Sequence, residues 1–179
     1  MIGYRFAEEG DMRFIRHAWV ENFRTSHHAG VIPMKIYFQL YHDIIREILE
    51  RDATRVLVAF NSSHPSQIFA FLAHENGLSL PLIHYVYVKE DFRQLPKKDP
   101  SFEKGLTSMM MEKVDIPTKG PFYYTFKTGI WARLTKWGGP FPKATYKPLY
   151  ARFDEDEAKA HDQEHTKHKT QAKEEQKCA

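Results

Sequence analysis

The segment YVYVKEDFRQLPKKDPSFEKGLTSMMMEK, residues 85–113, decides the fold that this sequence predicts. It begins as an apolar run typical of a buried strand and ends in GLTSMMMEK, which is typical of a helix. Between the two lie Arg93, three lysines, two prolines and the step Gly105–Ser108. A strand that leads into a helix through such a loop often holds a phosphate, because the first amides of a helix lack main-chain partners.

The rest of the chain predicts further strands and helices around this segment. Apolar runs bounded by turn residues predict strands over 3–8, 54–61, 67–75, 80–90, 121–128 and 144–153. Helical periodicity and capping residues predict helices over 12–26, 34–52, 105–114 and 129–138. The resulting order, β-α-α-β-β-β-α-β-α-β, predicts an α/β (α+β) domain with a mixed sheet and helices packed on it.

Two patterns predict which side chains are buried. The helix over 34–52 has an apolar stripe made of Tyr37, Leu40, Tyr41, Ile44, Ile45, Ile48 and Leu49. The strand over 80–90 is apolar on both faces, as central strands are, with His84, Val86 and Val88 alternating with Ile83, Tyr85 and Tyr87. Turn-forming residues at 62–66, SSHPS, predict a hairpin-like connection between the second and third strands.

The last 26 residues differ from the rest of the chain. Residues 154–179 contain no Val, Ile, Leu, Met, Phe, Trp or Tyr, and eight acidic residues face five lysines. Such a charged, low-complexity tail cannot bury enough apolar area to become ordered unless a partner binds it. We therefore expect one domain over 1–153, with a net charge of +6, and a tail over 154–179 with a net charge of −3.

Composition excludes several classes of protein. Cys178 is the only cysteine, so neither an internal disulfide nor a zinc site built on cysteines is expected, and no other metal site is predicted. No apolar run approaches 18 residues, and no signal sequence opens the chain, so we expect no membrane association and synthesis in the cytoplasm. No base-reading motif is present, so nucleic acid is not an expected partner.

The order of elements and five motifs resemble the GNAT acyltransferases over residues 3–153. The motifs are VAF (58–60), FAFLAHE (69–75), HYVYVKEDFR (84–93), TFKT (125–128) and YKPLYAR (146–152). They are also similar to the GNAT-like proteins encoded by tailed bacteriophages. The resemblance implies a three-layer fold, with helices on both faces of the mixed sheet, and acetyl-CoA as the cofactor of an active member.

The family's pyrophosphate loop, (Q/R)-x-x-G-x-(G/A), fits this chain only in part. In one register Arg93 opens the motif, and Pro96 and Lys98 replace its glycines. In the other register, which we prefer, Gly105 is the first glycine, Thr107 replaces the second, and the loop is longer. If coenzyme A binds, the resemblance places it against Val86, Val88, Arg93, Gly105, Leu106, Thr107 and Ser108.

Acidic residues in the longer loop predict competition for that site. Asp99 or Ser101 is expected to cap free amides that a pyrophosphate would need, whereas Lys97, Lys98 and Lys104 would restore part of the attraction. The resemblance implies a carboxylate base on the fourth strand and a late tyrosine as acid. Only weak candidates exist for these roles, Glu90 and Tyr146 or Tyr150. We interpret Glu90 as a solvated carboxylate and His84 as a core histidine.

The degenerate loop leads to the following interpretation. We expect a phage-type GNAT-fold protein with weakened or lost acyl transfer and no bound cofactor, which acts as a component of a viral particle or assembly. Its tail, 154–179, would bind neighbouring proteins and could carry it into the virion. The alternative is an active acetyl-CoA-dependent N-acyltransferase, so enzymatic activity is left open.

Overall fold

The computed structural model describes residues 1–26, 29–76, 79–93, 95, 99, 102–128, 131, 134–135 and 139–148 of the 179-residue chain. All of them belong to one compact unit, Met1–Pro148. The predicted tail, 154–179, and Tyr150 lie outside the described residues, so what was expected of them stays a prediction. The short helix predicted over 129–138 also falls largely outside, although Thr135 N–H donates to the Trp131 carbonyl (2.9 Å), as in a helix.

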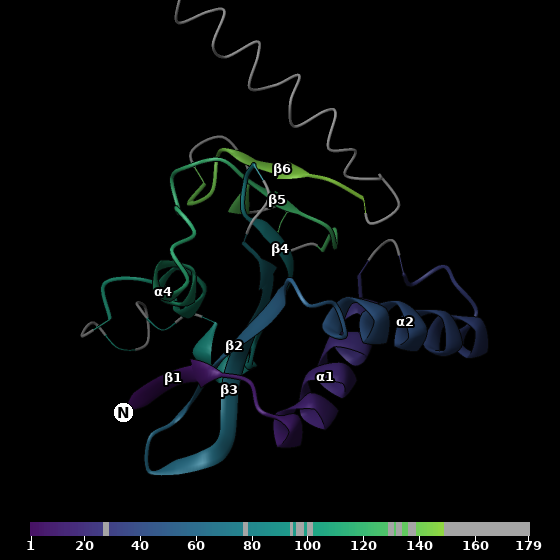
Figure 1. Cartoon of the computed structure of the whole chain (residues 1–179), viewed down its shortest axis with the longest axis horizontal. Helices are drawn as coiled ribbons and strands as arrows, with labels where there is room; N and C mark the ends of the chain where they lie inside the picture. Colours follow the sequence, from purple (N-terminus) through teal and green to yellow (C-terminus); the bar gives the residue numbers. More distant parts are fainter. Residues whose placement is uncertain are drawn as a thin grey trace, which may run out of the picture. The chain divides into compact units, whose positions relative to one another are not determined.

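The described elements follow the predicted order closely (Figure 1). Strands are β1 Ile2–Phe6, β2 Thr54–Asn61, β3 His64–Glu75, β4 Leu82–Val88, β5 Phe122–Tyr124 and β6 Ala144–Tyr146. Helices are α1 Met12–Arg24, α2 Met34–Leu49 and α4 Leu106–Lys113, with 3-10 turns η1 Glu9–Asp11 and η2 Glu90–Phe92. No described helix is long and apolar enough to cross a membrane.

One mixed sheet carries these elements in the order β1-β2-β3-β4-β5-β6. Neighbouring strands are antiparallel from β1 to β4, whereas β4 with β5 and β5 with β6 are parallel. The predicted connection at 62–66 is shorter than expected, because β3 begins at His64. Pro65 fits within β3 because the pairing jumps from Ile68 to His64 and leaves the residues between them outside the ladder.

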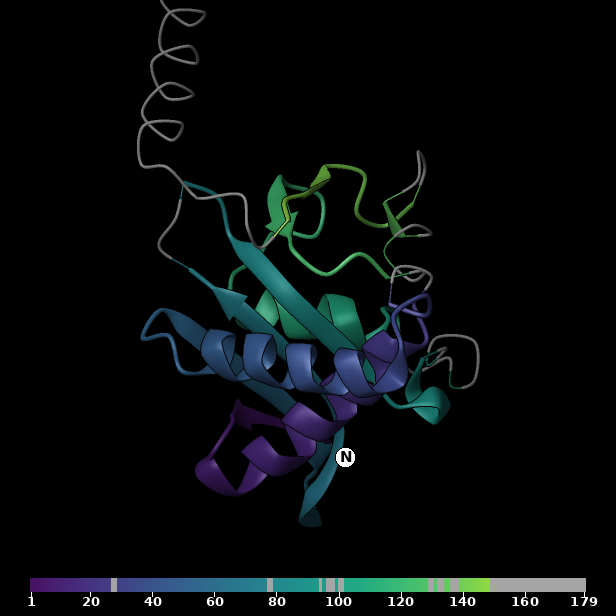
Figure 2. The same cartoon turned by 90° about the vertical axis from the view of Figure 1, so that its right-hand side faces the viewer.

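Helices cover both faces of the sheet (Figures 1 and 2). On one face α4 contributes Leu106, Met110 and Met111 to a core that also includes Leu57, Ala59, Ala70, Leu72 and Ile83. On the other face α1 packs its aromatic side chains against β3 and β4, and Trp19 stacks on Tyr85 with ring centroids 4.9 Å apart. The mixed α/β class predicted from the sequence is confirmed.

A β-bulge at His84 breaks the alternation predicted for β4. Ala73 lies opposite Tyr85 and His74 lies opposite Ile83, so His84 is the extra residue between two paired positions. The bulge reverses the side of every later residue. Ile83 therefore packs in the α4 core whereas Tyr85 stacks on Trp19 of α1, and the prediction that both share one face is wrong.

The apolar stripe predicted for α2 is buried in part. Tyr37, Ile45 and Ile48 are fully buried, as predicted. Leu40, in contrast, is 45% exposed, which corrects its place in the stripe. At 100° per residue, Leu40 points well away from Ile45 and lies at the margin of the buried face. The apolar stripe of the sequence is therefore wider than the face of α2 that α1 and the sheet cover.

Candidate functional site

Strands β4 and β5 pair over only a short length. Their register covers Leu82↔Tyr123 and Ile83↔Tyr124, and Thr125 N–H donates to the Ile83 carbonyl (3.1 Å). Beyond Ile83, β4 continues to Val88 in a ladder with β3 alone. The sheet therefore forks after Ile83, and one edge of β4 is left without a strand partner in the described part of the chain.

Two predicted binding residues lie along that edge. Lys89 N–H donates to the Phe69 carbonyl (2.8 Å) on β3. In an antiparallel ladder the direction of the main-chain groups alternates, so those of Val86 and Val88 face the fork. Both side chains pack against the core on the α4 side of the sheet. An extended ligand could therefore pair with the main chain of β4 as a strand would.

Arg93 lies at the same edge but has partners within the protein. Its Nε donates to the Val88 carbonyl (2.9 Å), and Nη2 lies 3.5 Å from Oδ1 of Asn22 on α1. The guanidinium thus joins the end of β4 to α1 and covers one of the acceptors of the fork. These contacts use Nε and Nη2, so within the described residues Nη1 is still available for the predicted contact with a pyrophosphate.

The first turn of α4 contains the other predicted binding residues. The helix begins at Leu106, as the second register predicts, and its first amides belong to Leu106, Thr107 and Ser108. Gly105, the N-cap residue, has φ −66° and ψ 151°, and no side chain of the described residues caps this end. The amides and the positive end of the helix dipole are therefore directed out of the helix toward any anion placed there.

The expected cap by Asp99 or Ser101 stays a prediction. The Asp99 carbonyl accepts a hydrogen bond from Phe102 N–H (3.1 Å) in a turn that precedes α4, and Ser101 is outside the described residues. Lys104, expected to attract phosphates, forms an ion pair with Glu112 (2.6 Å). Lys97 and Lys98 are also outside the described residues.

The two weak catalytic candidates are far from each other. Glu90 is exposed in η2, after the end of β4. Tyr146 is 38% exposed and in register with Tyr124, which is itself in register with Ile83, at the closed end of the fork. The part of β4 that separates them, from Ile83 to Val88, is roughly 15 Å long. The structure therefore does not assemble an acid–base pair from Glu90 and Tyr146.

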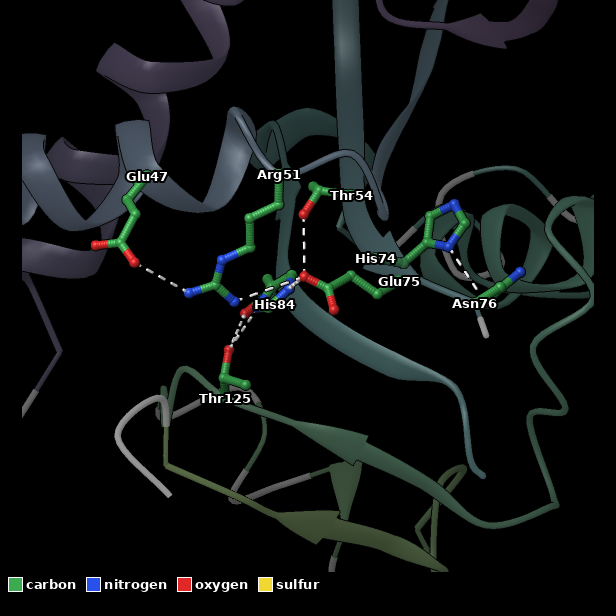
Figure 3. A network of polar contacts seen from close by, with 8 residues as sticks. All are labelled: Glu47, Arg51, Thr54, His74, Glu75, Asn76, His84 and Thr125. Carbon is green, nitrogen blue, oxygen red and sulfur yellow. Dashed lines mark hydrogen bonds and ion pairs between the residues drawn. The ribbon is translucent and has the colours of Figure 1, made fainter. Parts of the chain in front are cut away.

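A buried polar network lies where the fork begins (Figure 3). His84 Nδ1 is 3.2 Å from Thr125 Oγ1, and His84 Nε2 is 2.8 Å from Glu75 Oε1. Glu75 also accepts from Thr54 Oγ1 (3.1 Å) and lies 3.7 Å from Arg51 Nη1. The hydrogen bond from His84 is the main cause that lowers the pKa of Glu75. His84 is fully buried with both ring nitrogens partnered, in agreement with its interpretation as a core histidine.

Sequence reasoning missed Glu75 and Thr125 as members of this network. The local signal was an acid at the end of an apolar strand, FAFLAHE, because a buried strand tolerates a carboxylate only with partners.

Nearby on β3, His74 Nδ1 lies 3.3 Å from Asn76 Oδ1, and burial lowers the pKa of His74. Within the described ranges, no three His, Cys, Asp or Glu side chains group as a metal site would require.

Comparison with known proteins shows the fold. No family model matches this sequence, and no curated protein matches it by sequence. A candidate acetyl transferase from Pyrococcus furiosus superposes with a TM-score of 0.51 at 12% identity, covering 90% of this chain and 91% of its own. A candidate GNAT family acetyltransferase from Staphylococcus aureus subsp. aureus has a TM-score of 0.45 at 17% identity, covering 62% of this chain and 86% of its own. The PaiA N-acetyltransferase from Thermoplasma acidophilum, solved with coenzyme A, has a TM-score of 0.45 at 11% identity, covering 64% of this chain and 70% of its own. The chain has the GNAT acetyltransferase fold.

Proposed function

We propose that this protein is a coenzyme A-dependent N-acyltransferase. The observation that carries the proposal is a pair of main-chain surfaces, one on the edge of β4 beyond the fork and one at the first turn of α4. The edge of β4 at Val86 has no strand partner, and the first turn of α4 has no side-chain cap, within the described residues. These surfaces match the two parts of an acyl-coenzyme A, an extended arm that carries amides and a diphosphate.

Each surface supports the binding of one part of the cofactor. The amides of the thioester arm can pair with the main chain of Val86 as an added strand would. The diphosphate oxygens can accept from the amides of Leu106–Ser108, where the helix dipole adds positive potential. The helix that carries these donors begins after the longer loop, at Leu106.

The chemistry that fits this placement is direct transfer from sulfur to nitrogen. An amine attacks the thioester carbonyl, a C–N bond forms, the C–S bond breaks, and one proton moves from nitrogen to the departing sulfur. Holding the thioester at the fork would supply much of the rate through orientation. The proton transfer needs an acid and a base at the fork. Glu90 and Tyr146 are too far apart to act there as such a pair.

The alternative role, a component of a phage-type assembly with lost activity, depends on the tail. That role stays a proposal, since 154–179 lie outside the described residues. It is supported by the composition of the tail, which requires a partner for order. It predicts that deletion of 154–179 releases the protein from its complex and that acetyl-CoA does not bind.

Calorimetric titration of the full chain with acetyl-CoA tests the proposed function. An acyltransferase should bind one equivalent with a Kd within about 1 μM to 1 mM, the range of ordinary enzyme substrates. Absence of a saturable heat at millimolar acetyl-CoA would contradict the proposal and favour the assembly role.

A further inference from the structure

A hydroxyl, an imidazole and a carboxylate lie in line at the start of the fork (Figure 3). Thr125, His84 and Glu75 are 4%, 0% and 8% exposed, so bulk water does not compete for their hydrogen bonds. Thr125 directly follows β5, His84 is the bulge residue of β4, and Glu75 is the last residue of β3. This is the order of groups by which a base and its carboxylate partner move the proton of a hydroxyl.

The chemistry of the three groups sets the direction of each hydrogen bond. An ionised carboxylate can only accept, so His84 Nε2 carries the hydrogen that lies between it and Glu75, 2.8 Å away. In a neutral imidazole Nδ1 is then an acceptor, and Thr125 O–H donates to it across 3.2 Å. The resting chain runs from Thr125 O–H to His84 Nδ1 and from His84 Nε2–H to Glu75.

A second arrangement satisfies the network when His84 is protonated. Nδ1–H then donates to Thr125 Oγ1, and the hydroxyl turns to the main-chain carbonyl of His84, which lies 3.5 Å away. Among the charged groups around the imidazole, the carboxylate of Glu75 on β3 favours this state. The positive charge of Arg51 after α2 opposes it, although Arg51 pairs with Glu47 and Glu75, and burial lowers the pKa of His74 on β3. The imidazole can thus take up a proton through Thr125, which receives one hydrogen as it gives up another, and return it without leaving an unsatisfied group.

Thr125 lies at the closed end of the fork, next to the point where the free edge of β4 begins. Thr125 N–H donates to the Ile83 carbonyl, which marks the closed end of the fork. Its side chain contacts the carbonyl of His84, the bulge residue, and Val86 follows on the free edge of β4. Bulges commonly re-aim groups beside active sites, and this one directs His84 toward Glu75 and Thr125.

We propose that Thr125, His84 and Glu75 form the proton relay of acyl transfer, an inference that rests on the proposed function. As the amine nitrogen bonds to the thioester carbon, it gives its proton to Thr125 Oγ1, while Thr125 gives its own to His84 Nδ1. Glu75 stabilises the imidazolium. As the C–S bond breaks, the same two transfers run backward and deliver the proton to the thiolate. One proton has moved from nitrogen to sulfur, and all three side chains are restored.

A pair of substitutions at Thr125 tests the relay. Thr125→Val has the same shape without the hydroxyl, and Thr125→Ser keeps the hydroxyl. The measurements are the Kd for acetyl-CoA and the release of free thiol with water or spermidine as the acceptor. We expect both variants to bind acetyl-CoA like the wild type, with turnover lowered about 10²- to 10⁴-fold in Thr125→Val and less than about 10-fold in Thr125→Ser.

The outcomes separate the relay from the proposed function. Wild-type binding and turnover in Thr125→Val would overturn the relay alone. A wild-type chain that neither binds acetyl-CoA nor releases thiol from it would overturn both.

A readout independent of activity is the ¹⁵N spectrum of His84 in the full chain at neutral pH. The relay requires a protonated Nε2 and an accepting Nδ1, with the Nδ1 shift altered in Thr125→Val. A protonated Nδ1 on a neutral ring would exclude the resting state of the relay even if the enzyme is active.

Discussion

Glu75 and His84 lie on neighbouring strands, and the imidazole Nε2 donates to the carboxylate Oε1 across 2.8 Å in a buried setting. Glu75→Gln removes the charge and should lower the free energy of unfolding by about 1–3 kcal/mol at pH 7. The pKa of Glu75 is lowered in the folded protein, chiefly by this hydrogen bond. Its stabilisation is therefore complete above the ordinary pKa of 4.5 and is lost as the pH falls through the lower folded value.

Urea unfolding of the wild type and of Glu75→Gln between pH 7 and pH 3 measures this effect. The difference between the two proteins should shrink toward acid pH. Glu47→Gln is the matched control, because Glu47 is exposed and pairs only loosely with Arg51 (3.4 Å). A difference that stays constant down to pH 3 would show that the charge of Glu75 is not responsible.

Ser108→Asp should separate coenzyme binding from folding. Ser108 is the third residue of α4, where a carboxylate interacts favourably with the helix dipole, so stability should stay equal or rise by up to about 1 kcal/mol. The same carboxylate repels a diphosphate and competes for its donors, so the Kd for acetyl-CoA should rise by about tenfold or more, which corresponds to about 1.4 kcal/mol. Ser108→Asn, of the same shape without charge, is the control, and equal binding by both variants would remove α4 from the site.

Two alanine substitutions on α2 test the revised buried face. Ile45 is fully buried, so Ile45→Ala should lower the free energy of unfolding by about 2–5 kcal/mol. Leu40 is 45% exposed, so Leu40→Ala should cost less than about 1 kcal/mol. Chemical denaturation of both variants measures the contrast. Similar losses would mean that the wide apolar stripe predicted from the sequence is buried after all.

Gly3 and Gly105 should respond differently to alanine. A Cβ at Gly3 would lie 2.7 Å from the ring of Phe60, so the ring must shift, at a cost of about 1 kcal/mol. A Cβ at Gly105 would meet no atom within 4 Å, and its φ of −66° suits any residue. Gly105→Ala should therefore change stability by no more than about 0.5 kcal/mol. Thermal melts decide this, and a large loss in Gly105→Ala would show that the fold itself requires this glycine.

Local pattern predicted the parts of the candidate site that lie within single elements. Val86 and Val88 were assigned to a central strand, and the start of α4 after Gly105 was read from GLTSMMM. Both depend on apolar periodicity and on the break between strand and helix, which are properties of short segments. The N-cap position itself is Gly105, which has no side chain to cap α4, and capping by Asp99 or Ser101 stays a prediction.

The buried network could not be predicted in the same way, because its partners are distant in sequence. Thr125 and His84 are separated by 41 positions and meet only once β4 and β5 pair. The bulge that directs His84 depends on how β3 and β4 settle into register, which no pattern within β4 encodes. His84 was therefore recognised as a core residue, while its two partners were not.

The sequence by itself determined the class and order of the elements, since apolar periodicity, turn residues and composition act over a few neighbouring residues. It also determined that 154–179 lack the apolar residues needed for a core. Only the tertiary structure decided where the sheet forks, which edge of β4 is left free, and which hydroxyl and carboxylate face His84. Strand register and the packing of distant segments set these features. Both are decided by the free energy of the whole domain, which no single segment determines.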